Sequence, residues 1–291
     1  MSVVVRTLIA LLVLVGALTV DEAGASARPA AGPSKIGNDI SWPQCGRAYP
    51  TGQAFGIVGL NGGLANNKNK CFDSQWQWAL GSSGNTTQPK AALYVNTANP
   101  YGAGPVWWPN GNSFYSSPDG SDSNTANGTV AVSVPVPTEY GTCTADPVEN
   151  LACSYVYGWA KAYEDDQHFG PGLRGYQWWL DVETTNSWET PSSATPRAYE
   201  ANAATLRGMI NYLQGVNIEV GVYSTAYQWR QITGDRAQSD VFSTVLSWVA
   251  GASSSNAASF CSDPAKALIA GSKVTLVQYV SGRLDYDVAC A

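Results

Sequence analysis

The stretch Tyr176-Gln-Trp-Trp-Leu-Asp-Val-Glu183 predicts a buried β-strand that ends in two carboxylates, Asp181 and Glu183. Side chains alternate between the two faces of a strand, so these two acids point the same way. Two carboxyl groups on one face repel each other when both are ionised, which raises the pKa of one of them. The stretch therefore indicates a proton donor beside an ionised partner, an arrangement suited to general acid–base chemistry.

Strands and helices alternate on both sides of this stretch. The strand signals cover residues 36–42, 55–60, 91–96, 175–183, 217–224, 245–250 and 273–280. The helix signals cover residues 73–80, 154–168, 196–214 and 225–232. Such alternation predicts a mainly parallel sheet, and this many units in one domain predict an α/β fold with a single (β/α) barrel. We expect the eighth barrel strand to be short or hidden in residues 258–272.

The N-terminal region is typical of an exported protein. Arg6 precedes an apolar run from Leu8 to Val20, and small residues suited to cleavage follow. About 13 apolar residues are too few to span a bilayer but suit a secretion signal. We expect a signal peptide over residues 1–27, a short leader over 28–35 and the barrel over 36–291, and therefore a secreted, extracellular protein.

A long irregular insertion interrupts the barrel pattern at residues 100–150. It is rich in Gly, Pro, Ser and Asn and shows little helical periodicity. Such a stretch inside a domain is usually functional or a lid, unless it is disordered. The sequence does not decide between these roles.

The chain has six cysteines, an even number that suits an oxidising exterior. No Cys-x-x-Cys spacing occurs, so disulfides are favoured over a metal site. The pairs we favour are the local Cys143–Cys153, which would pin the far end of the insertion, with Cys45–Cys71 and Cys261–Cys290. They are one choice among about 15 connectivities open to six cysteines.

Charge and aromatic content narrow the classes of partner. The net charge is −6, so neither nucleic acid nor a membrane surface gains electrostatic support as a partner. Eleven tryptophans and fifteen tyrosines are a heavy aromatic load. Such rings stack on the C–H faces of sugars, although any single ring is more often part of a core. We expect a monomer that binds a polysaccharide.

Further acids fall at or near strand ends, where barrel active sites lie. Asp39 sits within the first predicted strand, and Asp285 with Asp287 follows the last. The first and last strands are neighbours in a closed barrel, so Asp39 and Asp285 could approach one another. Asp39 alone could equally cap a turn, and the two C-terminal acids could be solvated tail residues. Asp181 and Glu183 continue an apolar run, and a buried carboxylate needs a partner or a function.

The sequence lacks the residues that other common kinds of active site require. His168 is the only histidine, which leaves a Ser/His/Asp centre or a His-rich zinc site without support. The glycine-rich segment 56–63 lacks the ending of a phosphate-binding loop. Clustered acids could still hold Ca²⁺. We expect acid–base chemistry on carboxylates, with no cofactor and no metal.

Taken in order, several short motifs of the chain resemble a known family, glycoside hydrolase family 25. They are Gly37-Asn-Asp-Ile-Ser-Trp-Pro-Gln44, Trp179-Leu-Asp-Val-Glu183, Gly221-Val-Tyr-Ser224, Trp248-Val-Ala250 and Gln278-Tyr…Asp285. The family contains lysozymes (N-acetylmuramidases) with a modified β/α barrel of the TIM type. The resemblance covers residues 37–287, and its specificity comes from the ordered set.

The resemblance implies a role for each matched residue. Glu183 would be the general acid, and Asp181 would act as nucleophile or steady the N-acetyl group of the substrate. Asp39 and Asp285 would complete the acidic floor, and Asp287 falls where the family tends to have Asn. Tyr223, Trp248, Gln278 and Tyr279 would line the sugar groove. Apart from the family pattern, we also expect Trp42 and Asn96 to bind substrate.

The chain also departs from the family pattern. Trp42-Pro43 replaces a usual histidine, Gly59-Leu-Asn-Gly-Gly63 replaces a Lys-Ala-Thr-Glu-Gly-like run, and Val95-Asn-Thr-Ala-Asn99 replaces a histidine-bearing strand end. The insertion would lie over or beside the groove. The pattern indicates a divergent branch whose substrate-side residues are rewritten.

Our leading hypothesis is a secreted glycoside hydrolase that cleaves β-linked N-acetylated polysaccharide, with bacterial peptidoglycan as the first candidate. The alternative is a barrel that binds carbohydrate or cell wall without cleaving it, because a fold by itself does not determine function. An accessible cleft with converging acids would favour the enzyme. A third hypothesis, a disulfide-stabilised surface protein without a sugar ligand, predicts that nearly all aromatic residues are buried.

Overall fold

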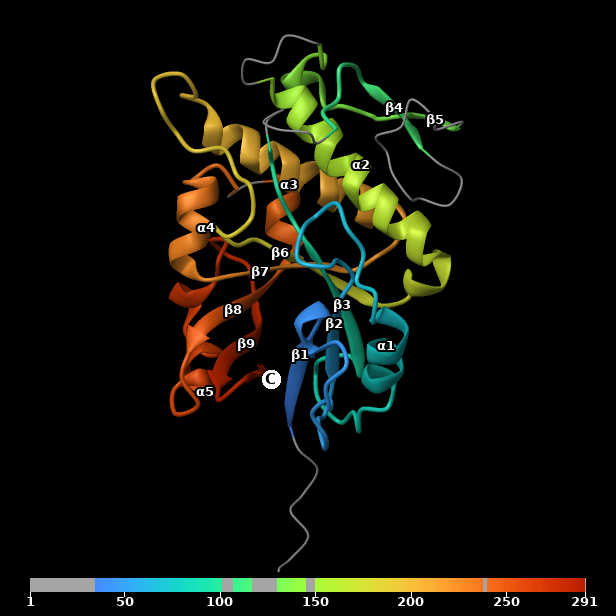
Figure 1. Cartoon of the computed structure of the whole chain (residues 1–291). Coiled ribbons are helices and arrows are strands. Elements are labelled where there is room, and N and C mark those ends of the chain that lie inside the picture. Colours follow the sequence, from blue (N-terminus) through green and yellow to red (C-terminus); the bar gives the residue numbers. More distant parts are fainter. Residues whose placement is uncertain (1–34, 101–106, 117–129, 145–149, 238–239, 291) are drawn as a thin grey trace, which may run out of the picture. The chain divides into compact units, whose positions relative to one another are not determined.

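The computed structural model describes residues 35–100, 107–116, 130–144, 150–237 and 240–290 (Figure 1). The predicted signal peptide and all of the predicted leader except Lys35 lie outside these residues. The described residues belong to one compact unit. No helix in the described ranges is both long and apolar enough to cross a membrane.

Eight strands close into a barrel in the order β1-β10-β9-β8-β7-β6-β3-β2. Their bounds are Ile36–Ile40 (β1), Gly56–Gly59 (β2), Ala91–Asn96 (β3), Gln177–Asp181 (β6), Val220–Ser224 (β7), Leu246–Ala252 (β8), Val274–Ser281 (β9) and Leu284–Ala289 (β10). Neighbouring strands are parallel except at β10, which pairs antiparallel with both β1 and β9. The predicted α/β barrel fold is therefore confirmed, with one reversed strand.

The expected position of the eighth strand is wrong. Residues 258–272 hold the end of the short helix α5 (Ala257–Phe260) and the 3-10 turn η5 (Pro264–Lys266). The eighth strand is β10, which forms a tight hairpin with β9 through Gly282, a residue with φ of 65°. The pattern of β10 was hard to recognise because its inward positions carry the acids Asp285 and Asp287 in place of apolar residues.

Helices cover the outside of the barrel. They are α1 (Phe72–Leu80), α2 (Leu151–Phe169), α3 (Ala198–Gly215) and α4 (Ala226–Thr233). One core lies between strands and helices, and a second fills the barrel interior with rings and aliphatic side chains. The interior core contains Ala54, Phe55, Ile57, Ala92, Trp179, Trp248 and Leu276. This packed interior forms a floor beneath the open end of the barrel.

The insertion packs on α2. Its described parts form an antiparallel hairpin of β4 (Ser113–Ser116) and β5 (Val130–Ser133), which lies beyond α2 in Figure 1. Phe114 and Val134 are buried in a cluster with residues of α2. The rest of the predicted insertion includes residues 101–106, 117–129 and 145–149, which lie outside the described part of the chain.

All three favoured disulfides are confirmed. Cys45 pairs with Cys71, Cys143 with Cys153 and Cys261 with Cys290. The second joins the end of the insertion to the first turn of α2, and the third joins the segment after α5 to the residue that follows β10.

Helices α2 and α3 lie side by side and cross closely (Figure 1). Glycines make this contact possible, because a Cβ atom built on Gly208 would lie 2.2 Å from the Tyr155 carbonyl oxygen. A Cβ atom on Gly158 would lie 1.9 Å from the Thr205 carbonyl oxygen. These contacts involve backbone atoms, so the helices would have to separate to accept a side chain.

We expect Gly208→Ala to destabilise the protein by about 1–3 kcal/mol, because overpacking outweighs the gain in helix propensity. Gly215→Ala is the matched control in the same helix, since a Cβ atom there would meet no neighbouring element of the described structure within 4 Å. Chemical unfolding of both variants measures the difference. Equal stabilities for the two variants would contradict the close-packing argument.

Candidate active site

Four acids meet at one end of the barrel. Parallel strands present their carboxyl ends at one rim, and β10, which is reversed, presents its first residues there. Asp39 of β1 is therefore directly opposite Asp285 of β10 in the strand register. Asp181 ends β6, and Glu183 follows two residues later.

The acids line a pocket of about 360 Å³. Its other lining residues come from β1 and the turn after it, and from β3, β7, β8 and β9. The complete lining is Asp39, Ile40, Ser41, Pro43, Gln44, Tyr94, Asp181, Glu183, Tyr223, Trp248, Gln278, Val280 and Asp285. The structure thus brings together seven of the ten residues that the sequence singled out. No described residue of the insertion is among the lining residues.

The acids of the pocket are buried or partly buried, and no positively charged side chain among the described lining residues offsets their charge. None of the described lining residues is Lys, Arg or His. Burial, the Glu183 charge and the Asp39 charge together hold the pKa of Asp181 well above its usual range. Burial and the neighbouring Asp285 raise the pKa of Asp39 to about 7. Burial also raises the pKa of Glu183 and of Asp285. The pocket therefore retains protons that exposed carboxylates would lose.

A hydrogen-bonded chain fixes the Asp39 carboxyl group. The Tyr223 hydroxyl donates to Gln278 Oε1 at 2.8 Å, and Gln278 Nε2 donates to Asp39 Oδ2 at 2.9 Å. The first bond sets which end of the Gln278 amide faces Asp39. Residues from β7, β9 and β1 are thereby joined across the barrel mouth.

Aromatic rings form the floor under the acids. The Trp248 ring lies 4.5 Å from the Tyr223 ring and 5.6 Å from the Trp179 ring, measured between centroids. The Trp179 ring packs directly on Gly221 of β7, and a Cβ atom at that position would lie 2.2 Å from the ring. The rings exclude water from the lower barrel, which contributes to the raised pKa values of the acids above them.

Two residues of the site were missed in the sequence. Tyr94 of β3 lines the pocket, and its hydroxyl bonds to Ser41. Its inward position followed from the strand period, since Ala92, two residues earlier, also faces the interior.

Gln228 is the second missed residue. Its Oε1 accepts hydrogen bonds from the Thr184 N–H at 2.6 Å and from the Thr184 hydroxyl at 2.9 Å. Its amide group bonds to Glu183 and partly offsets the rise in the pKa of that acid. The N-terminus of α4 holds Gln228 in place, because its N–H donates to the Thr225 side chain at 3.1 Å. The Thr-x-x-Gln spacing was the available signal.

Three predicted groove residues lie outside the pocket lining. Tyr279 stacks on Tyr286 with ring centroids 5.3 Å apart, because it follows Gln278 and adjacent strand residues face opposite ways. Trp42 is 50% exposed beside the pocket, where its ring covers Gly63. Asn96 is buried at the end of β3, where its N–H donates to Asn61 Oδ1 at 2.7 Å.

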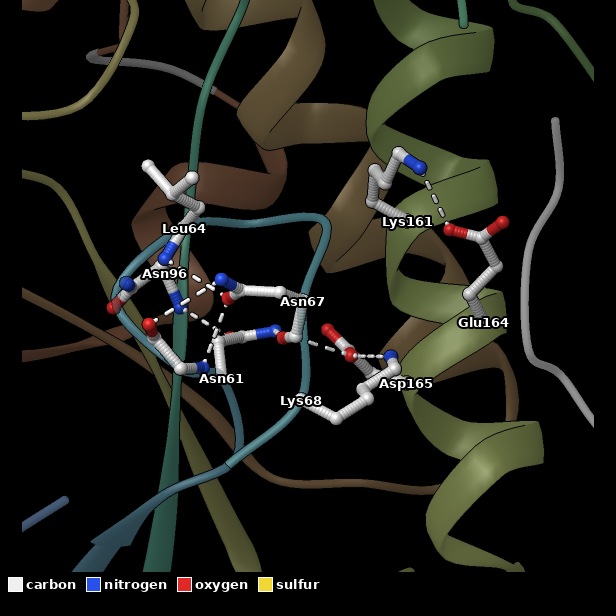
Figure 2. Close-up of polar contacts among 9 residues, drawn as sticks. Asn61, Leu64, Asn67, Lys68, Asn96, Lys161, Glu164 and Asp165 are labelled. Carbon is white, nitrogen blue, oxygen red and sulfur yellow. Dashed lines mark hydrogen bonds and ion pairs between the residues drawn. The ribbon is translucent and has the colours of Figure 1, made fainter. Parts of the chain in front are cut away.

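The loop of residues 60–69, between β2 and α1, is anchored to α2 (Figure 2). Figure 2 shows Asn61 between Asn96 of β3 and Asp165 of α2. Asn61 Nδ2 donates to Asp165 Oδ1 at 3.3 Å, and Lys68 Nζ pairs with the same oxygen. Lys161 and Glu164 form a further ion pair on α2 at 2.8 Å. The contacts of Asn61 and Lys68 with Asp165 fix the loop that carries Gly63 beneath Trp42.

Because the sequence contains clustered acids, a Ca²⁺ site was one of the possibilities that it allowed. Across the described ranges, no group of three or more His, Cys, Asp or Glu side chains is arranged to hold a metal ion.

The raised pKa of Asp39 predicts how stability depends on pH. Its pKa is about 7 in the folded protein and near 3.8 when unfolded, so its stabilising contribution is complete below pH 3.8 and is lost as pH rises through 7. We expect the melting temperature to fall between pH 5 and pH 8. Asp39→Asn, which has no proton to lose, should reduce this fall by on the order of 5 °C.

Calorimetry of the wild type, Asp39→Asn and Asp235→Asn measures this effect. Asp235 is an exposed loop residue, so its variant should keep the wild-type dependence. If the melting temperature of Asp39→Asn depends on pH as that of the wild type does, Asp39 is already ionised in the folded protein at pH 5.

Comparisons with known proteins find two lysozyme-like resemblances. The family model described as lysozyme-like protein 1 matches residues 172–261, a segment that includes β6, α3, β7, α4 and β8 and holds Asp181 and Glu183. A solved bacterial lysozyme from Streptomyces coelicolor is 15% identical and aligns over 88% of this chain and 92% of its own, with a TM-score of 0.41. No curated protein matches the chain significantly. The matched segment is less than half of the chain.

Proposed function

We propose that the protein is a glycoside hydrolase that cleaves β-linked N-acetylated polysaccharide, with bacterial peptidoglycan as the first candidate. The observation that carries the proposal is the convergence of four carboxyl groups on one open pocket without a cation among its described lining residues. Glycoside cleavage needs one protonated and one ionised carboxyl group across the scissile bond. The match to the lysozyme-like family model over β6 to β8 supports the same reaction class.

Glu183 is the general acid in this proposal. It lies beyond the end of β6 and is partly exposed, and burial raises its pKa, so it retains a proton for a bound sugar at higher pH than an exposed glutamate would. Gln228 orients its carboxyl group from the side. The proton passes from Glu183 to the glycosidic oxygen as the bond to the anomeric carbon breaks.

Asp181 stabilises the positive charge that develops on the sugar, because that charge favours the ionised form of a carboxyl group whose pKa burial otherwise holds high. It is 8% exposed, and its Oδ1 has no hydrogen-bond donor within the described structure. A buried oxygen of this kind needs a partner, and the N–H of a substrate acetamido group would supply one. Asp181 would then act either as nucleophile or by steadying that N-acetyl group, as the family resemblance implies.

The remaining groups bind sugar. Asp39 and Asp285 can accept hydrogen bonds from hydroxyl groups, and the Tyr223, Trp248 and Gln278 side chains line the pocket beside them. Two large aromatic side chains, Trp42 and Tyr227, stay 50% and 65% exposed beyond the ends of β1 and β7. Exposed rings near an acidic pocket favour a carbohydrate ligand over a surface protein without one.

The assignment to a divergent branch of glycoside hydrolase family 25, export and a monomeric state are parts of the same proposal. The three disulfides support export, because such bonds persist in oxidising compartments. A barrel that binds glycan without cleaving it would not require an open acidic pocket with a partly exposed proton donor.

We expect Glu183→Gln to fold normally and to lose about 10²–10⁴-fold in turnover, because an amide has no proton to transfer. New reducing ends released from purified peptidoglycan measure turnover, and circular dichroism checks the fold. Glu219→Gln is the matched control, because Glu219 is exposed just before β7, at the opposite end of the barrel. Full turnover by Glu183→Gln would refute the assigned role.

A second prediction concerns Gln228. Its hydrogen bond lowers the pKa of Glu183, so Gln228→Ala should raise that pKa and move the alkaline limb of the pH–activity profile upward. Turnover at the optimum should fall about tenfold because the acid loses its orientation. Gln231→Ala is the control on the same helix, since Gln231 bonds only to the exposed Tyr227 among the contacts described. An identical profile for both variants would remove Gln228 from the site.

A further inference from the structure

Asp287 is an acid of the barrel that the proposed reaction does not use. The sequence allowed a solvated tail residue at this position, but the structure corrects that expectation: Asp287 is 0% exposed. It lies on β10, where the register pairs it with Gln278 of β9 and with Gly37 of β1. It shares the inner face of β10 with Asp285, one step deeper in the barrel.

The two oxygens of Asp287 have different surroundings. Oδ1 accepts a hydrogen bond from Trp248 Nε1 at 3.0 Å. Oδ2 is buried and has no N–H or hydroxyl donor among the described residues. Asp39 is the neighbour to which the Asp287 side chain makes its other hydrogen bond. One carboxyl group therefore lies between an indole donor and a second carboxyl group.

A hydrogen bond between two carboxyl groups requires a proton on one of them, since carboxylate oxygens only accept. The titratable groups that face the pair come from five places: Asp285 on β10, Asp181 at the end of β6, Glu183 just beyond it, Tyr94 on β3 and Tyr223 on β7. The pocket above it has no cationic side chain among its described lining residues. A proton is then the available means of removing the repulsion.

Asp287 is the member that keeps this proton, because it is 0% exposed whereas Asp39 is partly exposed and lines the pocket, and burial favours the neutral form of an acid. Burial, followed by the charges of Asp39 and Asp285, holds its pKa well above the usual range, whereas that of Asp39 rises to about 7. Asp39 also accepts a hydrogen bond from the Gln278 amide, and this bond favours the ionised form of Asp39.

We propose that Asp287 is a neutral carboxylic acid at neutral pH and that its O–H donates to Asp39, which positions the Asp39 carboxyl group in the pocket. Asp287 is thus a positioning residue that links the Trp248 ring to the acid above it. Its effect on catalysis rests on the proposed function, but its protonation does not. Loss of the proton at alkaline pH would leave two anions in contact and displace Asp39.

Two substitutions separate this role from simple packing. In Asp287→Asn, the amide carbonyl can still accept a hydrogen bond from Trp248, and the NH₂ group can still donate one to Asp39. The amide side chain, however, cannot ionise. We expect activity within about twofold of wild type across the pH range, because the amide keeps both hydrogen bonds and leaves the titration of Glu183 unchanged. Asp287→Leu has a similar volume without either bond, and should lose more than about tenfold at every pH. Equal behaviour of the two variants would overturn the proposal.

A spectroscopic readout tests the protonation without any turnover. The infrared carbonyl band of protonated carboxyl groups, measured in Glu183→Gln above pH 7, should contain a component that disappears in Glu183→Gln/Asp287→Asn. Absence of any such band in Glu183→Gln overturns the proposal, whether or not the double variant folds. If the band is present while the wild type cleaves no glycan, the proposed function fails and the role of Asp287 stands.

Discussion

The antiparallel pairing of β10 with β1 is the interaction on which the rest of the structure depends. It closes the barrel and puts Asp285 opposite Asp39. Because β10 runs against its neighbours, its first residues reach the rim where the parallel strands end. The Cys261–Cys290 disulfide holds the far end of this closing strand. Without the reversed strand, the C-terminal acids would not face the acids of β1 and β6.

Closure places several carboxyl groups together at a cost in stability. Asp39, Asp181 and Asp287 each have a raised pKa for which burial is the largest cause. The surrounding structure offsets part of this cost with neutral donors, namely the Gln278 amide and the Trp248 indole. Neutral donors orient the acids and offset only part of the rise in their pKa, whereas a salt bridge to a cation would favour the ionised form much more strongly. Such local conflict is typical of functional sites.

Much of the fold could be predicted from the sequence, because apolar runs of strand length are separated by helical segments. β3 has the predicted bounds of Ala91–Asn96. β10 was missed because its inward residues are acidic, so the usual apolar signal is absent on that face. Tyr279 was assigned to the groove beside Gln278, although adjacent strand residues point to opposite sides. The sequence did not assign Gln228 and Tyr94 to the site, because their contacts with Glu183 and Ser41 join different elements of the fold.

The sequence by itself determined that Asp181 and Glu183 share a strand face, since the period of a strand is local. It also favoured disulfides over a metal site through the number and spacing of the cysteines, while the pairing itself was decided only by the structure. Only the tertiary structure decided which acids meet, which residue orients each, and that Asp287 is buried. The physical reason is that burial and proton affinity depend on groups from distant parts of the chain, which closure of the barrel brings into contact.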